Sequence, residues 1–176
     1  MSDNVMLQGL LRRRSVRKYS TREVEQEKID AVIEAGLYAP SGMGRQSAII
    51  VECRDPKLKE MLVEENRRIG GFAAGMDPFY GAPVLLIVLA DRNNPNHVCD
   101  GALALGNMLN AAYALDLGSC WINRAAQEFE LPQYREYLRK AGIGDEYIGI
   151  GHCILGYPEG ELPKPAARRP GRVYRI

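Results

Sequence analysis

Arginine is the residue type in this chain that most clearly points to chemistry, and it is concentrated near the N-terminus. Residues 12–19 read Arg-Arg-Arg-Ser-Val-Arg-Lys-Tyr and contain five cations, although the 176-residue protein has a formal net charge of only +1. Arginine suits phosphate because its planar guanidinium donates two hydrogen bonds to phosphate oxygens. The cluster predicts a site for an anionic ligand, and the plainer alternative is a solvated helix end.

A second basic segment closes the chain. From Glu159 onward the prolines at 163, 165 and 170 exclude a regular helix, and five cations follow one another: Lys164, Arg168, Arg169, Arg172 and Arg175. Two cationic segments repel each other unless an anion lies between them. We therefore expect both ends of the chain to meet at one anionic group, with a solvated arm as the alternative.

Other reaction chemistries find little support. The two histidines, His97 and His152, have no carboxylate or cysteine at metal-ligand spacing, and no nucleophile with a neighbouring base is evident. Neither G-x-x-x-x-G-K-[ST] nor a strand-linked G-x-G-x-x-G occurs, so side chains must hold the phosphate. We predict no metal site and interpret His152, within an apolar stretch, as a hydrogen-bonded core residue.

Composition bounds the compartment and the partners. The four cysteines at 53, 99, 120 and 153 form no C-x-x-C pair, so we expect reduced, mostly buried thiols. The near-zero net charge disfavours nucleic acid as a partner. There is no signal-peptide pattern, and the longest apolar run, Val84 to Ala90, is too short for a membrane helix. The expected compartment is the cytoplasm.

Hydrophobic spacing predicts helices that alternate with three or four strands in one domain over residues 1–176. Expected helices are a short one from Val5 into the basic cluster, then 27–37, stopped by Pro40, and 56–70, 101–117 and 132–141. Expected strands are 48–53, 84–90, 118–124 with a polar turn at its end, and 147–155. Residues 39–46 and 70–75 are expected loops. The residues predict an α+β or α/β sandwich with the 84–90 strand in the middle of its sheet.

Small side chains mark the 101–117 helix. It contains alanine at 102, 104, 111, 112 and 114 and glycine at 106. Neighbouring backbones can therefore approach closely. The helix belongs either in the core or at a subunit interface, and the sequence leaves both open.

Six segments in this order and spacing resemble the FMN-dependent nitroreductase family over nearly the whole chain. They are Arg13 to Tyr19, Ala39-Pro40-Ser41 followed by Gln46, Tyr80 to Pro83, Gly118 to Trp121, Gly156-Tyr157-Pro158, and Arg168-Arg169-Pro170. The resemblance implies an α+β fold, a three-layer sandwich with a central, mostly antiparallel sheet flanked by helices. It also implies a homodimer with FMN at the interface.

The same resemblance implies a set of cofactor contacts. Arg13, Ser15, Arg168 and Arg169 would hold the phosphate and ribityl chain, and Arg14 would bind through its backbone or its side chain. Arg17 would lie near the pyrimidine end of the ring, where reduced flavin carries negative charge. Gln46 would hydrogen-bond the ring, Pro40 and Ser41 would pack on it from the partner chain, and the Asn123–Arg124 turn would offer a backbone amide to N5. No side chain is required as an acid or base.

The implied activity is ping-pong hydride transfer from NADH or NADPH, through the flavin, to a small acceptor such as a nitroaromatic or quinone. The alternatives are a flavin-dependent dehalogenase or dehydrogenase of the same family, a non-catalytic FMN-binding module, and a basic-armed nucleic-acid binder. The sequence departs from the family pattern around Gln46, with Gly44 before it and Ser47-Ala48 after it. It also lacks the long helical excursion that narrows the pocket of larger members, so it leaves the acceptor open.

Overall fold

A four-stranded antiparallel sheet organises the described part of the computed structural model, residues 3–176. The strand order is β1-β2-β4-β3, and the strands are β1 (Ala48–Glu52), β2 (Val84–Asp91), β3 (Gly118–Ile122) and β4 (Tyr147–Gly156). Residues 85–90 of β2 are buried, as expected for a strand with neighbours on both edges and helices on both faces. The predicted central position of this strand is confirmed.

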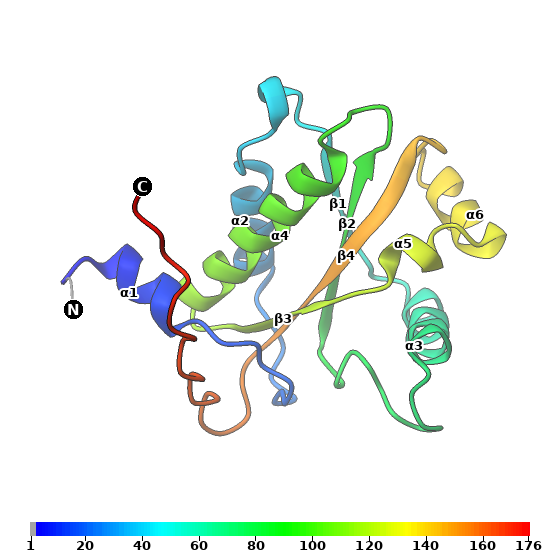
Figure 1. The fold of residues 1–176 in the computed structure, drawn as a ribbon. Helices are drawn as coiled ribbons and strands as arrows, with labels where there is room; N and C mark the ends of the chain where they lie inside the picture. Colours follow the sequence, from blue (N-terminus) through cyan, green and yellow to red (C-terminus); the bar gives the residue numbers. More distant parts are fainter. Residues whose placement is uncertain (1–2) are drawn as a thin grey trace.

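Helices cover both faces of the sheet (Figure 1). One layer holds α2 (Gln26–Leu37) and α4 (His97–Ala114), and the other holds α3 (Pro56–Gly70), α5 (Ala125–Glu128) and α6 (Pro132–Lys140). Strand β2 serves both layers because its side chains alternate: Leu85, Ile87 and Leu89 face α3, whereas Leu86 and Val88 face α4. The predicted three-layer α+β sandwich with an antiparallel sheet is confirmed.

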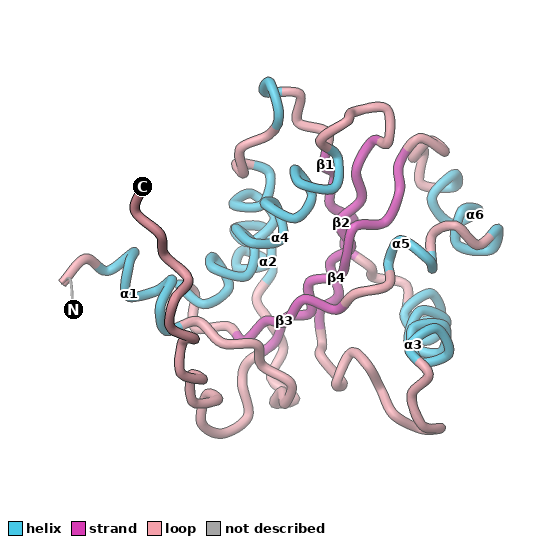
Figure 2. Tube along the Cα trace, in the orientation of Figure 1, coloured by secondary structure: helices cyan, strands magenta, loops and turns pink. Residues whose placement is uncertain are grey.

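The remaining elements lie outside these layers. Helix α1 (Val5–Arg12) precedes the basic cluster, and a short 3-10 turn, η1 (Gly42–Gly44), follows α2. After Gly156 the chain has no helix or strand, and residues 159–176 are exposed (Figure 2). The extended tail predicted from its prolines is therefore confirmed.

Two surfaces of this fold are apolar and uncovered. Helix α1 has no buried residue, and its exposed side chains include Val5, Met6 and Leu11. On α4 the face toward the sheet is buried, but Val98 and Leu103 are exposed, and a Cβ added at Gly106 would meet nothing within 4 Å. The core interpretation of α4 therefore holds for the face toward the sheet, and an interface on the open face stays a prediction.

Some predicted boundaries were wrong. Helix α4 begins at His97, not Gly101, and ends at Ala114 rather than residue 117. Gly101 lies inside the helix. Its role there is close packing against β4, since an added Cβ would lie 2.6 Å from Ile150 Cγ1. Helix α2 begins at Gln26, one residue before the predicted start, and ends at Leu37 as predicted.

The prediction that the cysteines are mostly buried was partly wrong. All four thiols are free, and Cys120 and Cys153 are buried. Cys99 is exposed and Cys53 is half-buried. Cys99 lies one position after the exposed Val98, near the start of α4, outside the core that the alanines of this helix help to form.

Candidate functional site

The basic cluster is fixed against the beginning of β3. Ser15 forms a parallel bridge with Ser119, and the Val16 amide donates a hydrogen bond of 2.9 Å to the Ser119 carbonyl. Val16 is buried against Gly118, where any larger residue would clash with it at 2.9 Å. Tyr19 donates to the Val16 carbonyl at 2.7 Å, and burial raises the pKa of this hydroxyl. The segment therefore has a defined place in the fold.

The arginines of the cluster differ in what their side chains do. Arg13 caps the C-terminus of α1, where the helix dipole favours a cation, and its Nη1 is buried with no hydrogen-bond partner. Arg14 turns back, donating from Nη1 to the carbonyls of Leu11 at 2.9 Å and Arg13 at 2.5 Å. Arg17 is exposed, with its guanidinium carbon 5.9 Å from the Tyr80 ring centroid. A buried guanidinium nitrogen without an acceptor fits an anionic ligand at Arg13.

Strand β3 leads from this cluster to the Asn123–Arg124 turn. Four residue steps separate Ser119 from Asn123, which is about 13 Å in a strand. Arg124 has a left-handed backbone, with φ 86°, and its Nε donates to Asn66 Oδ1 at 2.9 Å. Its guanidinium also lies over the Phe72 ring, 4.9 Å from the centroid. The cluster and the turn thus lie along one strand, at a separation that suits an elongated ligand.

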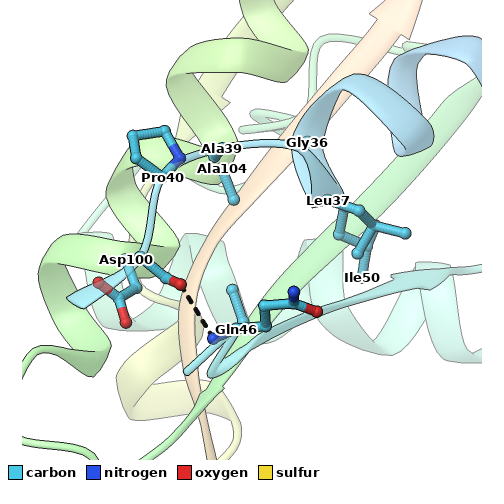
Figure 3. A pocket seen from close by; sticks show the side chains of 10 residues that line it. Gly36, Leu37, Ala39, Pro40, Gln46, Ile50, Asp100 and Ala104 are labelled. Atoms are coloured by element: carbon cyan, nitrogen blue, oxygen red, sulfur yellow. Dashed lines mark hydrogen bonds between the residues drawn. The ribbon is translucent and has the colours of Figure 1, made fainter. Parts of the chain in front are cut away.

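Pro40, Ser41 and Gln46 lie elsewhere, around a pocket of about 140 Å³ between α2, β1 and α4 (Figure 3). The Gln46 amide donates to Ser41 Oγ at 2.9 Å, so the loop is closed on itself. Asp100 of α4 holds this loop in place through hydrogen bonds. This buried carboxylate accepts hydrogen bonds from the Gly42 amide at 2.9 Å and Ser47 Oγ at 2.7 Å.

A single protomer does not bring all predicted site residues together. The α1 end of the cluster lies at the C-terminal part of α4, where Gly9 approaches Tyr113, whereas the Pro40–Gln46 loop is held by Asp100 in the first turn. At 1.5 Å per residue, Asp100 and Tyr113 are about 20 Å apart along the helix. In one protomer the predicted site residues therefore form two groups, at opposite ends of α4.

The end of the basic cluster contacts the beginning of the tail. Tyr19 bridges Pro158, and Lys18 pairs with Glu159 at 3.1 Å. Arg168 and Arg169 lie further along the exposed tail. The last part of this tail, red in Figure 1, runs on the same side of the molecule as α1.

Sequence reasoning missed the buried polar residues that fix these segments. Asp100 holds the Pro40–Gln46 loop, and Asn66 and Glu128 lie beneath the Asn123–Arg124 turn. His152 was predicted as a hydrogen-bonded core residue, and its Nε2 lies 2.5 Å from Glu128 Oε2, which confirms that prediction. A signal was present for Asn66, which lies four residues after the buried Leu62 on α3, at a position where an apolar residue is usual.

The model of the nitroreductase family matches residues 10–157, and the chain belongs to this family. A nitroreductase from Bacteroides fragilis, solved with bound FMN, is 30% identical, with a TM-score of 0.88, covering 98% of this chain and 99% of that one. An NADH dehydrogenase from Thermus thermophilus is 37% identical over 156 residues, 87% of this chain and 69% of the relative. An NAD(P)H-dependent FMN reductase from Bacillus subtilis is 28% identical over 160 residues, 74% of this chain and 61% of the relative.

Proposed function

We propose that this protein is an FMN-dependent oxidoreductase that transfers hydride from NADH or NADPH to a small acceptor such as a nitroaromatic or a quinone. The family and the activities named for the relatives support the class of reaction. The observation that carries the proposal in this chain is Arg13, whose buried Nη1 has no hydrogen-bond partner at the end of α1. A phosphate group supplies the missing acceptor.

The residues of this chain would bind and orient the cofactor, and bound FMN would supply the hydride chemistry. Arg13 and Ser15 would hold the phosphate and ribityl chain at the start of β3, joined by Arg168 and Arg169 of the tail. Arg14 would bind through its backbone or its side chain: its Nη1 already bonds two carbonyls, but its Nε is buried without a partner. Arg17 would stabilise negative charge near the pyrimidine end of the reduced ring. The Asn123–Arg124 turn would present a backbone amide to N5.

The protein would act as a homodimer. The open face of α4 and the exposed apolar side chains of α1 together form a surface suited to a second copy. In a two-fold interface the same patch meets itself, so the N-terminal end of one α4 lies opposite the C-terminal end of the other when they pack antiparallel. The partner's Pro40–Gln46 loop would then complete the site begun by Arg13 and Ser15, which resolves the separation of about 20 Å within one protomer.

The described residues, 3–176, include no helix that meets the length and hydropathy needed to span a bilayer. We place the protein in the cytoplasm as part of the proposal, because free thiols persist there. The whole chain would act as one FMN-binding domain.

The direct test is the spectrum of the purified protein. We expect the absorption of oxidised flavin and its loss on addition of NADH or NADPH without oxygen. A colourless protein that takes up no FMN on reconstitution contradicts the proposal. Bound flavin that neither nucleotide reduces would instead identify a non-catalytic FMN-binding module. A panel of nitroaromatic, quinone and halogenated acceptors would then separate a general reductase from a specialised dehalogenase or dehydrogenase.

The phosphate site predicts the effect of two substitutions. Arg13→Ala and Arg168→Ala should each weaken FMN binding by about 1.5–3 kcal/mol, the range for one charged hydrogen bond. The dissociation constant follows from quenching of FMN fluorescence on titration with flavin-free protein. Arg12→Ala is the matched control, since Arg12 is a neighbouring, exposed cation with no assigned contact. Equal affinity in all three variants would place the phosphate elsewhere.

A further inference from the structure

Four polar side chains form a continuous hydrogen-bonded chain beneath the Asn123–Arg124 turn. His152 Nε2 lies 2.5 Å from Glu128 Oε2, Asn66 donates to Glu128 Oε1 at 2.6 Å, and Arg124 Nε donates to Asn66 Oδ1 at 2.9 Å. Asn66, Glu128 and His152 have exposed fractions of 0%. The chain crosses from β4 through α5 and α3 to the residue that follows β3 by two positions.

Asn66 is the member that contacts both residues of the turn. Its Nδ2 donates to the Asn123 carbonyl at 2.9 Å and to Glu128 at 2.6 Å, while its Oδ1 accepts from Arg124. A primary amide has two N–H donors, so both are used. Among the bonds made by side chains of the described residues, those from Asn66 and to Asn66 are the ones that fix this turn.

The turn needs such support because Arg124 adopts a left-handed backbone conformation, which only glycine takes at no steric cost. The hydrogen bond between Arg124 Nε and Asn66, together with the Phe72 ring beside the guanidinium, holds the side chain in place. An arginine kept in this conformation by buried partners is a feature of functional sites more than of ordinary turns.

Packing alone does not require this polar chain. Its surroundings are apolar, with the Phe79 and Phe129 rings 5.1 Å and 6.4 Å from the His152 ring. Buried polar groups are often replaced by hydrophobic residues without loss of stability, so their presence needs another reason. His152 Nδ1 is even left without a partner. Fixing one geometry of the adjacent turn provides that reason.

We propose that Asn66 is a positioning residue for flavin reduction: backed by Glu128 and His152, it fixes the Asn123–Arg124 turn so that the turn's backbone amide meets the flavin ring in one orientation. This inference rests on the proposed function. Fixed backbone donors stabilise developing charge without reorganising during the reaction. A misplacement of about 1 Å in a reacting geometry costs on the order of 100-fold in rate.

The test compares Asn66→Asp with Leu62→Val. The aspartate keeps the acceptor for Arg124 but has no N–H to donate to the Asn123 carbonyl or to Glu128. It therefore removes these two hydrogen bonds with little change in side-chain volume. Leu62 lies one turn earlier on the same helix, is fully buried and packs in the same core. Its substitution therefore perturbs α3 without removing a hydrogen bond of Asn66.

Two measurements are made, and the first needs no flavin. Amide hydrogen exchange of the flavin-free protein should speed up at residues 123–125 by about tenfold or more in Asn66→Asp and stay near wild type in Leu62→Val. In the FMN-loaded protein, stopped-flow reduction by NADH or NADPH should slow on the order of 100-fold in Asn66→Asp. Its FMN dissociation constant should change by less than about threefold, because the phosphate contacts lie at the other end of β3.

Equal behaviour of the two variants in exchange and in reduction rate overturns the positioning role. If Asn66→Asp does not fold, Glu128→Gln and Glu128→Leu are compared instead. The glutamine retains an acceptor for Asn66, so only the leucine should speed up amide exchange at residues 123–125. Equal exchange rates in both variants overturn the proposal. A wild-type protein that binds no FMN overturns the proposed function itself. If the wild type binds FMN and the nucleotides reduce it, but the variants behave like the wild type, the positioning role alone is overturned.

Discussion

Tyr157 shows how one side chain can tie the end of the sheet to a helix. Two cations lie close to its ring, with the Arg22 guanidinium carbon 3.8 Å and Lys28 Nζ 5.1 Å from its centroid. Its hydroxyl donates to Glu25 Oε2 at 2.6 Å. That hydrogen bond is the main cause that lowers the pKa of Glu25 to about 2, with a smaller contribution from the hydrogen bond of Arg22. The cluster therefore holds an ionised carboxylate at the beginning of α2.

The sign of this pKa shift predicts a pH dependence. The pKa of Glu25 is lower in the folded protein than the value of about 4.3 in an unfolded chain. The contribution of Glu25 to stability is therefore complete above about pH 4.3 and is lost as the pH falls through about 2. Tyr157→Phe should remove most of this contribution. Urea unfolding between pH 6 and pH 2 should show that the difference in unfolding free energy between wild type and variant shrinks with acid.

Tyr38→Phe is the control for this experiment, since Tyr38 is 81% exposed. A Tyr157→Phe difference that stays constant over the whole pH range would contradict the assignment of the Glu25 shift.

A single site residue could be predicted from the sequence when its partners lie close to it in the chain. The basic cluster at Arg13 was visible because its residues are neighbours in the chain. Asp100 and Asn66 were not, because they act on segments far away in the sequence: Asp100 bonds Gly42, and Asn66 bonds Asn123. Hydrophobic periodicity reports burial but not which polar group a buried amide or carboxylate will meet.

At the scale of elements, the close approach of α5 to β4 depends on one glycine. A Cβ at Gly149 would lie 2.1 Å from the Ala125 carbonyl oxygen and 2.3 Å from its carbon, so backbone would have to move. Beside it, the pairing of β2 and β4 shifts register between Val88 and Leu89. This irregularity and the missing side chain together let α5 begin directly after the Asn123–Arg124 turn.

Gly149→Ala should therefore destabilise the protein by about 3 kcal/mol, the upper end for an extra methyl group in a packed interior. Thermal or urea unfolding measures the loss. Gly144→Ala is the matched control, because the atoms nearest to its new methyl group belong to the Glu146 side chain, which is exposed and can move away. Equal stability of the two variants would show that α5 lies further from β4 than described.

Most elements were predictable from the sequence because their signals are local. The apolar run gave β2, and the charged amphipathic pattern after Pro56 gave α3 with its bounds. Helix α5 was not predicted, since its four residues, Ala125–Glu128, are too few for a periodic pattern. The antiparallel direction came from the family resemblance, and the strand order was not predicted. Strand pairing joins segments that are distant in the chain, and neither segment alone shows which partner it will take.

At the scale of the whole molecule, the open face of α4 makes a prediction about assembly. Gly106 has no atom within 4 Å of an added Cβ, so a larger side chain fits the isolated protomer. Gly106→Leu should leave the fold intact while blocking close approach of a second copy. Light scattering should then report a mass near the 19.6 kDa of one chain, where the wild type gives about twice that value.

Ala141→Leu, at an exposed position after α6, is the control for crowding alone. A Gly106→Leu protein that remains dimeric would show that α4 is not at the interface. Bound FMN should be lost with the dimer, because each proposed site needs the Pro40–Gln46 loop of the partner.

Helix α1 and the last residues of the tail lie on one flank of the molecule, and α6 lies on the opposite flank (Figure 1). Purification tags fused at either terminus would hang from segments that carry proposed phosphate ligands. A cysteine introduced at Lys140, which is exposed at the end of α6, gives a distant point of attachment once the exposed Cys99 is replaced by serine. Immobilisation there on an electrode would leave the proposed flavin face directed toward solution.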